Sequence, residues 1–269
     1  LPDLKYFYDN IEIFPKREIA TYDYLVESKD LPYERIDVLN KIITNKVNIV
    51  VTTIEAVMQK MIAKKTLYKN ILKLKVGSEC KLEDLKKYLV SLGYERSDMV
   101  EGRGQFAVRG GIVDISISYK TGIRIEFWGD TIDSIKYFDL DSQISSDSIN
   151  TISIYPFTEF LLDNKLDVDS KMCKQKYLPH YSRDIQGIWN YLYNCTLIYY
   201  DYNQIISAYR LLRESIINYD NEINDSIKTD YMFDISDVKY NNIIYMLEFD
   251  NILDLNIKFK NNYLSNNID

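Results

Sequence analysis

The stretch VEGRGQFAVRGGIVDISISYKTGIRIEFWGDTIDSIKYFDL, residues 100–140, decides the fold of this chain. It holds three short apolar runs, Phe106 to Val108, Ile112 to Ile117 and Ile123 to Phe127. Two glycine-bearing breaks separate them, Arg109-Gly110-Gly111 and Lys120-Thr121-Gly122. Period-2 alternation between such breaks is typical of consecutive antiparallel strands. The stretch therefore predicts a small antiparallel sheet.

The third apolar run has two chemically different faces. Alternation places one set of side chains on the core face, Ile123, Ile125 and Phe127, and the other set on the opposite face, Arg124, Glu126 and Trp128. Because each strand residue advances the chain by about 3.3 Å, Arg124 and Trp128 point the same way about 13 Å apart. Arg109 ends the first strand of the same predicted sheet.

Arginine and tryptophan dominate binding energy at protein interfaces, because each offers a large contact area with a polar group. Arg109, Arg124 and Trp128 are therefore the candidate partner-binding residues. A purely structural interpretation also fits the spacing. In it, Trp128 is a partly buried sheet residue and Arg124 is the ion-pair partner of Glu126 or Asp130.

The segments before and after the sheet alternate between strand and helix patterns. Before it we expect a strand at Ile11 to Phe14, a helix at Tyr33 to Ile43, a strand at Ile49 to Thr52 and a further helix opened by a Thr52/Glu55 capping box. Leucines at helical spacing from Leu82 to Leu92, ended by Gly93, predict a helix that covers the sheet. Ser142 to Asn150 has a loop composition, and Thr151 to Tyr155 predicts a last strand.

The remaining chain returns to helices and strands. We expect a helix at Arg183 to Tyr193, a buried strand at Thr196 to Tyr199, a helix at Asn203 to Ile217 and strands near Ile243 and Ile257. The predicted fold class is α/β and α+β. It divides into a partial α/β domain at residues 1–76, an α+β domain with an antiparallel sheet and a helix at 77–160, and an α/β domain at 161–269.

A long ordered string of motifs in the central domain closely resembles one family. The motifs are Gly93-Tyr94-Glu95-Arg96, Asp98 to Phe106, Arg109-Gly110-Gly111-Ile112-Val113-Asp114-Ile115, Arg124-Ile125-Glu126-Phe127, Gly129-Asp130 and Ile132-Asp133-Ser134-Ile135. The family is the bacterial transcription-repair coupling factor, Mfd, and the similar region is the second domain of its UvrB-like amino-terminal module. Phe14 to Glu18, Glu34 to Leu39 and Val50 to Ala56 resemble the preceding helicase-like domain.

The resemblance implies a function and a site. In that family the second domain binds the excision-repair protein UvrA, and the positions matching Arg109, Arg124 and Trp128 belong to the contact surface. The residue at 128 is usually phenylalanine there, and Ile144 stands where the family commonly has arginine. The implied role is a non-catalytic, cytoplasmic UvrA-recruiting adaptor module. The parts that bind ATP and Mg²⁺, RNA polymerase and double-stranded DNA are then expected downstream in a longer protein.

The net charge of the chain bears on the kind of partner that it could bind. The formal net charge is −7 over 269 residues, which argues against a surface whose main task is neutralising phosphates.

Cys80, Cys173 and Cys195 lack the spacing of a zinc site or a disulfide framework, so we expect free thiols. No stretch predicts a membrane span. The sequence begins without methionine, so we expect it to be part of a longer protein.

Several kinds of catalytic site have little support. No G-x-x-x-x-G-K-[ST] loop occurs, and His180 is the only histidine, so neither a phosphate-binding loop nor a multi-histidine metal centre is expected. Asp130 and Asp133 are interpreted as residues that flank a turn. Lys60, Lys64 and Lys65 form a positive cluster, with the first two on one face of a predicted helix. A solvated helix end is the expected role of this cluster.

The alternative assignment is UvrB, the related damage-verifying protein. UvrB carries a long tyrosine-rich hairpin between the strand at Ile11 to Phe14 and the helix at Tyr33 to Ile43, where this chain has a short connector with Tyr22 and Tyr24. UvrB also typically has Arg-Gly-Asp where this chain has Arg109-Gly110-Gly111. Both differences oppose UvrB. A third possibility is an α/β protein with an unrelated partner.

Overall fold

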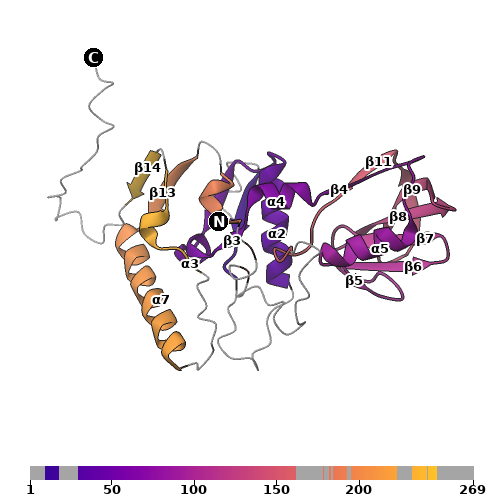
Figure 1. Ribbon diagram of the computed structural model, residues 1–269. Helices are drawn as coiled ribbons and strands as arrows, with labels where there is room; N and C mark the ends of the chain where they lie inside the picture. Colours follow the sequence, from indigo (N-terminus) through magenta and orange to yellow (C-terminus); the bar gives the residue numbers. More distant parts are fainter. Residues whose placement is uncertain are drawn as a thin grey trace, which may run out of the picture.

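The computed structural model describes residues 10–17, 30–161, 178, 182, 184–192, 195–222, 232–240 and 242–246. These residues form a mixed α/β protein, as predicted (Figure 1). The antiparallel sheet lies at one end of the molecule, helices α2, α3 and α4 lie in the middle, and α7 with β13 and β14 lies at the other end. The sheet that carries the candidate partner-binding residues thus lies at one end of the molecule.

The first part of the chain forms the expected alternation of strands and helices. Its elements are β1 (Ile11–Phe14), α2 (Asp30–Ile43), β2 (Ile49–Thr52), α3 (Ile54–Met58), β3 (Met61–Ile62) and α4 (Lys64–Lys69). Strands β1 and β2 pair in parallel, in the register Ile11 to Ile49. Helix α2 buries Ile36 and Leu39 completely, and Pro32 lies in its first turn, where a missing N–H leaves no helical bond unmade.

Two local predictions in this part are wrong. The N-cap of α3 is Thr53, whose hydroxyl accepts a hydrogen bond from the N–H of Ala56. The Thr52 hydroxyl donates instead to the Phe14 carbonyl, so the cap lies one residue later than in the predicted Thr52/Glu55 capping box. Helix α3 ends at Met58, and Lys60 therefore lies outside any helix and does not share a helical face with Lys64. The Lys64 ammonium instead donates to the carbonyl of Tyr191 at 3.0 Å.

The stretch that decides the fold forms a six-stranded sheet with the order β10-β9-β8-β7-β6-β5. Its strands are β5 (Glu95–Arg96), β6 (Gln105–Arg109), β7 (Ile112–Ser116), β8 (Thr121–Trp128), β9 (Thr131–Asp139) and β10 (Ser145–Ser148). The three predicted antiparallel strands are confirmed as β6, β7 and β8. The prediction of a loop throughout Ser142 to Asn150 is wrong, because part of this polar segment pairs as edge strand β10.

Helix α5 (Leu82–Ser91) covers one face of the sheet, as predicted. Leu85 and Leu89 share a core with the apolar row of the sheet, which includes Phe106, Val113, Ile115, Ile123, Ile125, Ile132 and Ile135. Strand β9 keeps both Ile132 and Ile135 buried because its register with β8 shifts next to Asp133. The face of the sheet away from α5, which carries Asp114, Arg124, Glu126, Lys136 and Phe138, is called the outer face below.

Two strands join the sheet to the rest of the molecule. Strand β4 (Leu72–Lys75) pairs antiparallel with β11 (Thr151–Ile154), in a ladder of its own. The predicted last strand at Thr151 to Tyr155 is therefore present, but it pairs with β4 and not with the six-stranded sheet. The chain leaves the sheet beside the point where it enters.

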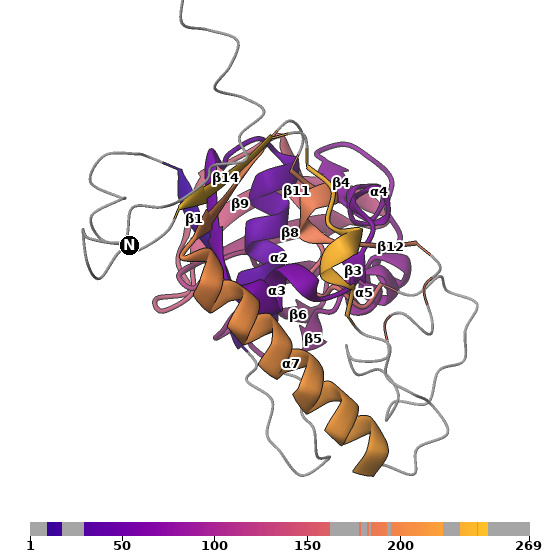
Figure 2. The ribbon, with the colours of Figure 1, turned by 90° about the vertical axis from the view of Figure 1, so that its left-hand side faces the viewer.

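The later segments pack against the first part of the chain. They comprise β12 (Ile185–Gln186), η3 (Ile188–Asn190), β13 (Thr196–Tyr200), α7 (Tyr202–Glu222), η4 (Ile235–Asp237) and β14 (Asn242–Met246). Strand β12 pairs with β3, Ile185 opposite Ile62. Helix α7 lies against α3 (Figure 2). Its Tyr209, Leu212 and Ile216 pack against a small apolar cluster of Met58 and Met232.

Sequence predictions for these later segments have mixed outcomes. The long helix and the strand near Ile243 are confirmed. The helix predicted at Arg183 to Tyr193 is wrong, because β12 and η3 occupy its described residues. Strand β13 exists but is not buried, since Ile198 and Tyr200 are exposed. The predictions for Cys173, His180 and the strand near Ile257 fall outside the described residues. None of the described helices is long and apolar enough to cross a membrane.

Candidate partner-binding surface

The register of the sheet sets a polar row across the outer face. Asp114 on β7 stands directly opposite Arg124 on β8, and Arg124 stands opposite Lys136 on β9. Directly opposed side chains on one face of antiparallel strands have Cβ atoms about 5 Å apart, so charged neighbours in this row interact. The row therefore places the Arg124 guanidinium between the Asp114 carboxylate and the Lys136 ammonium.

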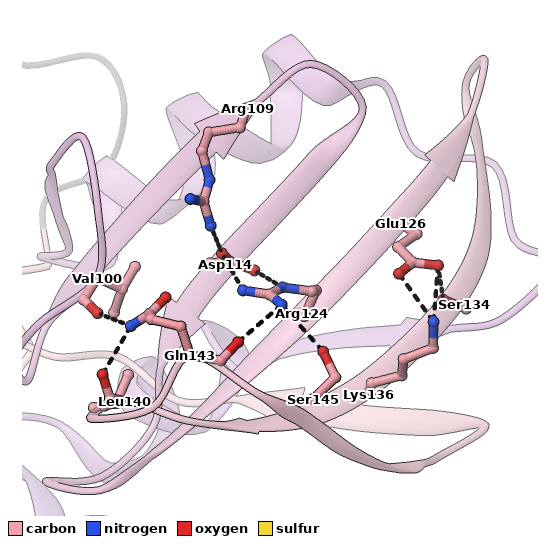
Figure 3. A network of polar contacts seen from close by, with 10 residues as sticks. All are labelled: Val100, Arg109, Asp114, Arg124, Glu126, Ser134, Lys136, Leu140, Gln143 and Ser145. Carbon is pink, nitrogen blue, oxygen red and sulfur yellow. Dashed lines mark hydrogen bonds and ion pairs between the residues drawn. The ribbon is translucent and has the colours of Figure 1, made fainter.

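Asp114 holds both candidate arginines (Figure 3). Its Oδ2 accepts hydrogen bonds from Arg109 Nη2 at 2.7 Å and Arg124 Nη2 at 3.0 Å, and its Oδ1 accepts from Arg124 Nε at 2.8 Å. The Asp114 side chain is only 1% exposed. A buried carboxylate needs such partners, since an uncompensated buried charge is costly. The hydrogen bond to Asp114 is the largest influence on the pKa of Arg124 and raises it.

Arg124 uses the other side of its guanidinium to hold a loop. Its Nη1 donates to the Gln143 carbonyl at 3.3 Å and to Ser145 Oγ at 3.1 Å. The same guanidinium lies 4.8 Å from the ring centroid of Phe138. Gly122 makes room for that ring, because a Cβ there would lie 2.2 Å from a Phe138 ring carbon. With its side chain 16% exposed, Arg124 is largely enclosed by its own domain.

The structural interpretation of Arg124 named the wrong partners. Glu126 accepts instead from Ser134 Oγ at 2.7 Å and from Lys136 Nζ at 2.9 Å. These hydrogen bonds, that from Ser134 first, hold the pKa of Glu126 below its usual value. Asp130 lies in the turn between β8 and β9. The partner of Arg124 is Asp114, which sits on a neighbouring strand.

The two remaining candidate residues are accessible to a partner. The Arg109 side chain is 50% exposed and is held at one end, by Asp114. Trp128 is 83% exposed, at the end of β8, so the alternative of a partly buried sheet tryptophan is wrong. The structure brings Arg109 and Arg124 together on one carboxylate and leaves Trp128 farther along the same strand as Arg124. All three belong to the outer-face side of the sheet.

Sequence reasoning missed Asp114 and the loop that follows β9. A charged residue within the apolar run Ile112 to Ile117 was a signal, because a polar residue among buried neighbours requires a partner. Counting the hairpin register back from the Lys120-Thr121-Gly122 turn would have placed Asp114 beside Arg124. The contacts of Gln143 and Ser145 had no comparable signal, since they depend on how the chain returns after Asp139.

The described residues also include titratable side chains away from this surface, among them two cysteines. Over the residues that the structure describes, no group of three or more His, Cys, Asp or Glu side chains could hold a metal ion. Cys80 and Cys195 are free thiols, and burial raises the pKa of each. A raised thiol pKa disfavours the reactive thiolate at neutral pH.

A comparison with known protein families finds a match in the region that contains the sheet. Residues 72–160 match the family described as the UvrB interaction domain. These residues contain the whole six-stranded sheet, helix α5 and the β4–β11 ladder. The match thus covers every residue of the outer face.

Similar curated proteins extend beyond this domain. The chain is 31% identical to the transcription-repair-coupling factor of Bacillus subtilis (strain 168) over 154 residues, which is 57% of this chain and 13% of that protein. It is 28% identical to the factor of Rickettsia bellii (strain RML369-C) over 260 residues, 87% of this chain and 22% of that protein. It is 29% identical to the factor of Rickettsia prowazekii (strain Madrid E) over 238 residues, which is 81% of this chain and 21% of that protein.

This chain thus spans 13% to 22% of the length of these relatives. It is similar to part of the transcription-repair-coupling factors, and its residues 72–160 match the model of the UvrB interaction domain family.

Proposed function

We propose that this chain is a UvrA-recruiting adaptor module and that UvrA docks on the outer-face side of the sheet. The observation that carries the proposal is the exposure of Trp128, 83%, on a domain of the UvrB interaction family. A large aromatic side chain left in water costs hydrophobic free energy that a partner recovers by covering it. The relatives' name, transcription-repair-coupling factor, agrees with a role that brings a repair protein to transcription.

The surface combines one apolar and one cationic contact. Trp128 offers an aromatic surface, and Arg109 offers a half-exposed guanidinium. Arg109 can exchange or share its Asp114 contact with a carboxylate of the partner, because it is anchored through a single nitrogen. Arg124 contributes mainly through the loop that it holds. The expected UvrA surface therefore presents an apolar pocket beside an acidic group.

In this proposal the chain performs no catalysis of its own. ATP, Mg²⁺, RNA polymerase and double-stranded DNA would be bound by other parts of the longer transcription-repair-coupling factors. UvrB was the alternative source of the sequence, and the similar proteins reported above are coupling factors. We therefore assign the outer face to recruitment and not to damage verification.

A titration of purified UvrA into this protein and its Trp128→Ala variant tests the proposal. We expect Trp128→Ala to weaken binding by at least ~2 kcal/mol, a roughly thirtyfold rise in Kd, because central tryptophans are typical hot spots. Its fold should be unchanged, since the side chain is exposed. Val90→Ala on α5 is the matched control, because Val90 is 59% exposed on the opposite side of the sheet. Equal affinities for wild type and a folded Trp128→Ala would refute the assignment.

A further inference from the structure

A second large apolar side chain is exposed next to Arg124. Ile144 is 68% exposed, in the loop between β9 and β10. Its neighbours on both sides, Gln143 and Ser145, accept hydrogen bonds from the Arg124 guanidinium (Figure 3). Single exposed apolar residues are common on protein surfaces and need no explanation by themselves. What sets Ile144 apart is how firmly its backbone is held.

The backbone around Ile144 is fixed by hydrogen bonds on every side. Gln143 adopts the left-handed conformation, with φ 60°, and its amide Nε2 donates to the carbonyls of Val100 at 2.9 Å and Leu140 at 2.8 Å. The N–H of Asp139 donates to the Ile144 carbonyl at 3.1 Å. A non-glycine residue at positive φ persists only where its surroundings hold it there. The loop therefore presents Ile144 in one defined position.

Asp114 and Arg124 form the support beneath this loop. Because Asp114 engages Nε and Nη2 of Arg124, the guanidinium can turn only Nη1 toward Gln143 and Ser145. The same guanidinium also lies over the Phe138 ring, which limits its movement on that side. The chain of contacts from Asp114 through Arg124 to the loop places Ile144 beside the residues already assigned to the partner.

We propose that Ile144 is a further contact residue of the UvrA-docking surface, with Arg124 as its positioning residue. This inference rests on the proposed function, and the partner it requires is an apolar side chain of UvrA. Ile144 and Trp128 then form two apolar contacts on either side of the enclosed Arg124, with Arg109 as the cationic contact. The strand spacing of about 13 Å between Arg124 and Trp128 fits within a standard interface of roughly 800 Å² per partner.

Preorganisation gives this arrangement its binding advantage. A flexible loop would lose conformational entropy when a partner ordered it, and that loss would offset part of the gain from burying Ile144. Here the hydrogen bonds within the domain have already ordered the loop. Covering the aliphatic side chain therefore contributes to affinity with little further ordering.

Titration of UvrA against a small set of variants tests the inference. Ile144→Ser removes the apolar group and leaves the backbone contacts of the loop in place, so we expect Kd to rise about tenfold. The matched control is Val90→Ser, an exposed aliphatic residue on α5, whose Kd should stay within about twofold of wild type. An unchanged thermal midpoint for each variant verifies folding.

The positioning role has its own readout. Arg124→Lys keeps the positive charge but replaces the planar donor set that reaches Asp114, Gln143 and Ser145 together. In that background Ile144→Ser should raise Kd by no more than about twofold, because Ile144 is no longer held in place. A full tenfold effect of Ile144→Ser in the Arg124→Lys background would overturn the positioning role.

The outcomes separate the two proposals. If Trp128→Ala weakens binding but Ile144→Ser does not, the contact role of Ile144 is wrong and the docking surface remains. If the wild-type protein fails to bind UvrA, the proposed function is wrong and the Ile144 contact falls with it. Equal losses for Ile144→Ser and Val90→Ser would also overturn the contact role, since the effect would not be local to the outer face.

Discussion

Two arginine–carboxylate clusters in this protein use the same chemistry in opposite settings. The inner cluster joins Arg35 on α2 to Glu159 after β11, with Nε to Oε1 at 2.6 Å and both side chains 0% exposed. The outer cluster joins Arg109 and Arg124 to Asp114, with the two arginines 50% and 16% exposed. The exposure of the arginine side chains separates the roles of the two clusters. The inner cluster fixes one part of the chain to another, and the outer cluster leaves a cation available to a partner.

The inner cluster links distant parts of the sequence. Gln59 Oε1 accepts from Arg35 Nη1 at 3.1 Å and from the N–H of Arg17 at 2.8 Å, and Arg17 Nη2 lies 3.6 Å from Glu159 Oε2. Burial by itself would raise the pKa of Glu159, but the charges of Arg35 and Arg17 outweigh it and lower the pKa. Glu159 therefore stays ionised and ties the end of the matched region, residues 72–160, to helix α2.

The largest expected effect comes from breaking the inner cluster. Glu159→Ala leaves the Arg35 charge buried without its carboxylate, so we expect the free energy of unfolding to fall by about 3–5 kcal/mol. Chemical denaturation monitored by circular dichroism measures this loss. Glu12→Ala is the matched control, because it removes a partly exposed ion pair with Lys41, which should contribute less than about 1 kcal/mol. A loss for Glu159→Ala no larger than that of the control would contradict a structural role for the inner cluster.

A smaller loss is expected from the outer cluster. Asp114→Asn removes the charge that both outer arginines share, and charge-assisted hydrogen bonds contribute about 1.5–3 kcal/mol each to stability. We expect the free energy of unfolding to fall by roughly 2 kcal/mol, near the lower end of that range, in the same denaturation experiment. In this variant the half-exposed Arg109 guanidinium can be solvated by water, and Arg124 keeps its contacts to Gln143 and Ser145. An Asp114→Asn loss greater than that of Glu159→Ala would reverse the ranking and show that exposure is not what separates the clusters.

The two clusters also differ in how far the sequence predicts them. Arg109, Asp114 and Arg124 lie within one stretch of alternating residues and glycine turns, so the strands, their order and the exposed face could be predicted from spacing alone. The identity of the Arg124 partner was missed because the prediction searched along one strand, whereas the ion pair crosses between strands. The alternation placed Trp128 on the same face as Arg124, but only the structure gives its exposure.

The inner cluster could not have been predicted in this way. Arg35 and Glu159 are separated by 124 residues, and no periodic pattern connects them. The same limit explains the wrong helix at Arg183 to Tyr193. That segment has a helical pattern of apolar residues, but Ile185 and Gln186 pair with β3 more than 120 residues earlier. Edge strand β10 was missed because its residues, Ser145 to Ser148, are polar and lack the alternation of a half-buried strand.

Amide hydrogen exchange of this protein with and without UvrA tests the central claim most directly. If the outer cluster supports the docking surface, UvrA should slow exchange at Trp128 to Asp130 and at Ser142 to Ser145, with no change along α5 on the other side of the sheet. Slowed exchange confined to α7 and β13, with unchanged exchange at Trp128 and Ile144, would contradict the assignment of UvrA binding to this face.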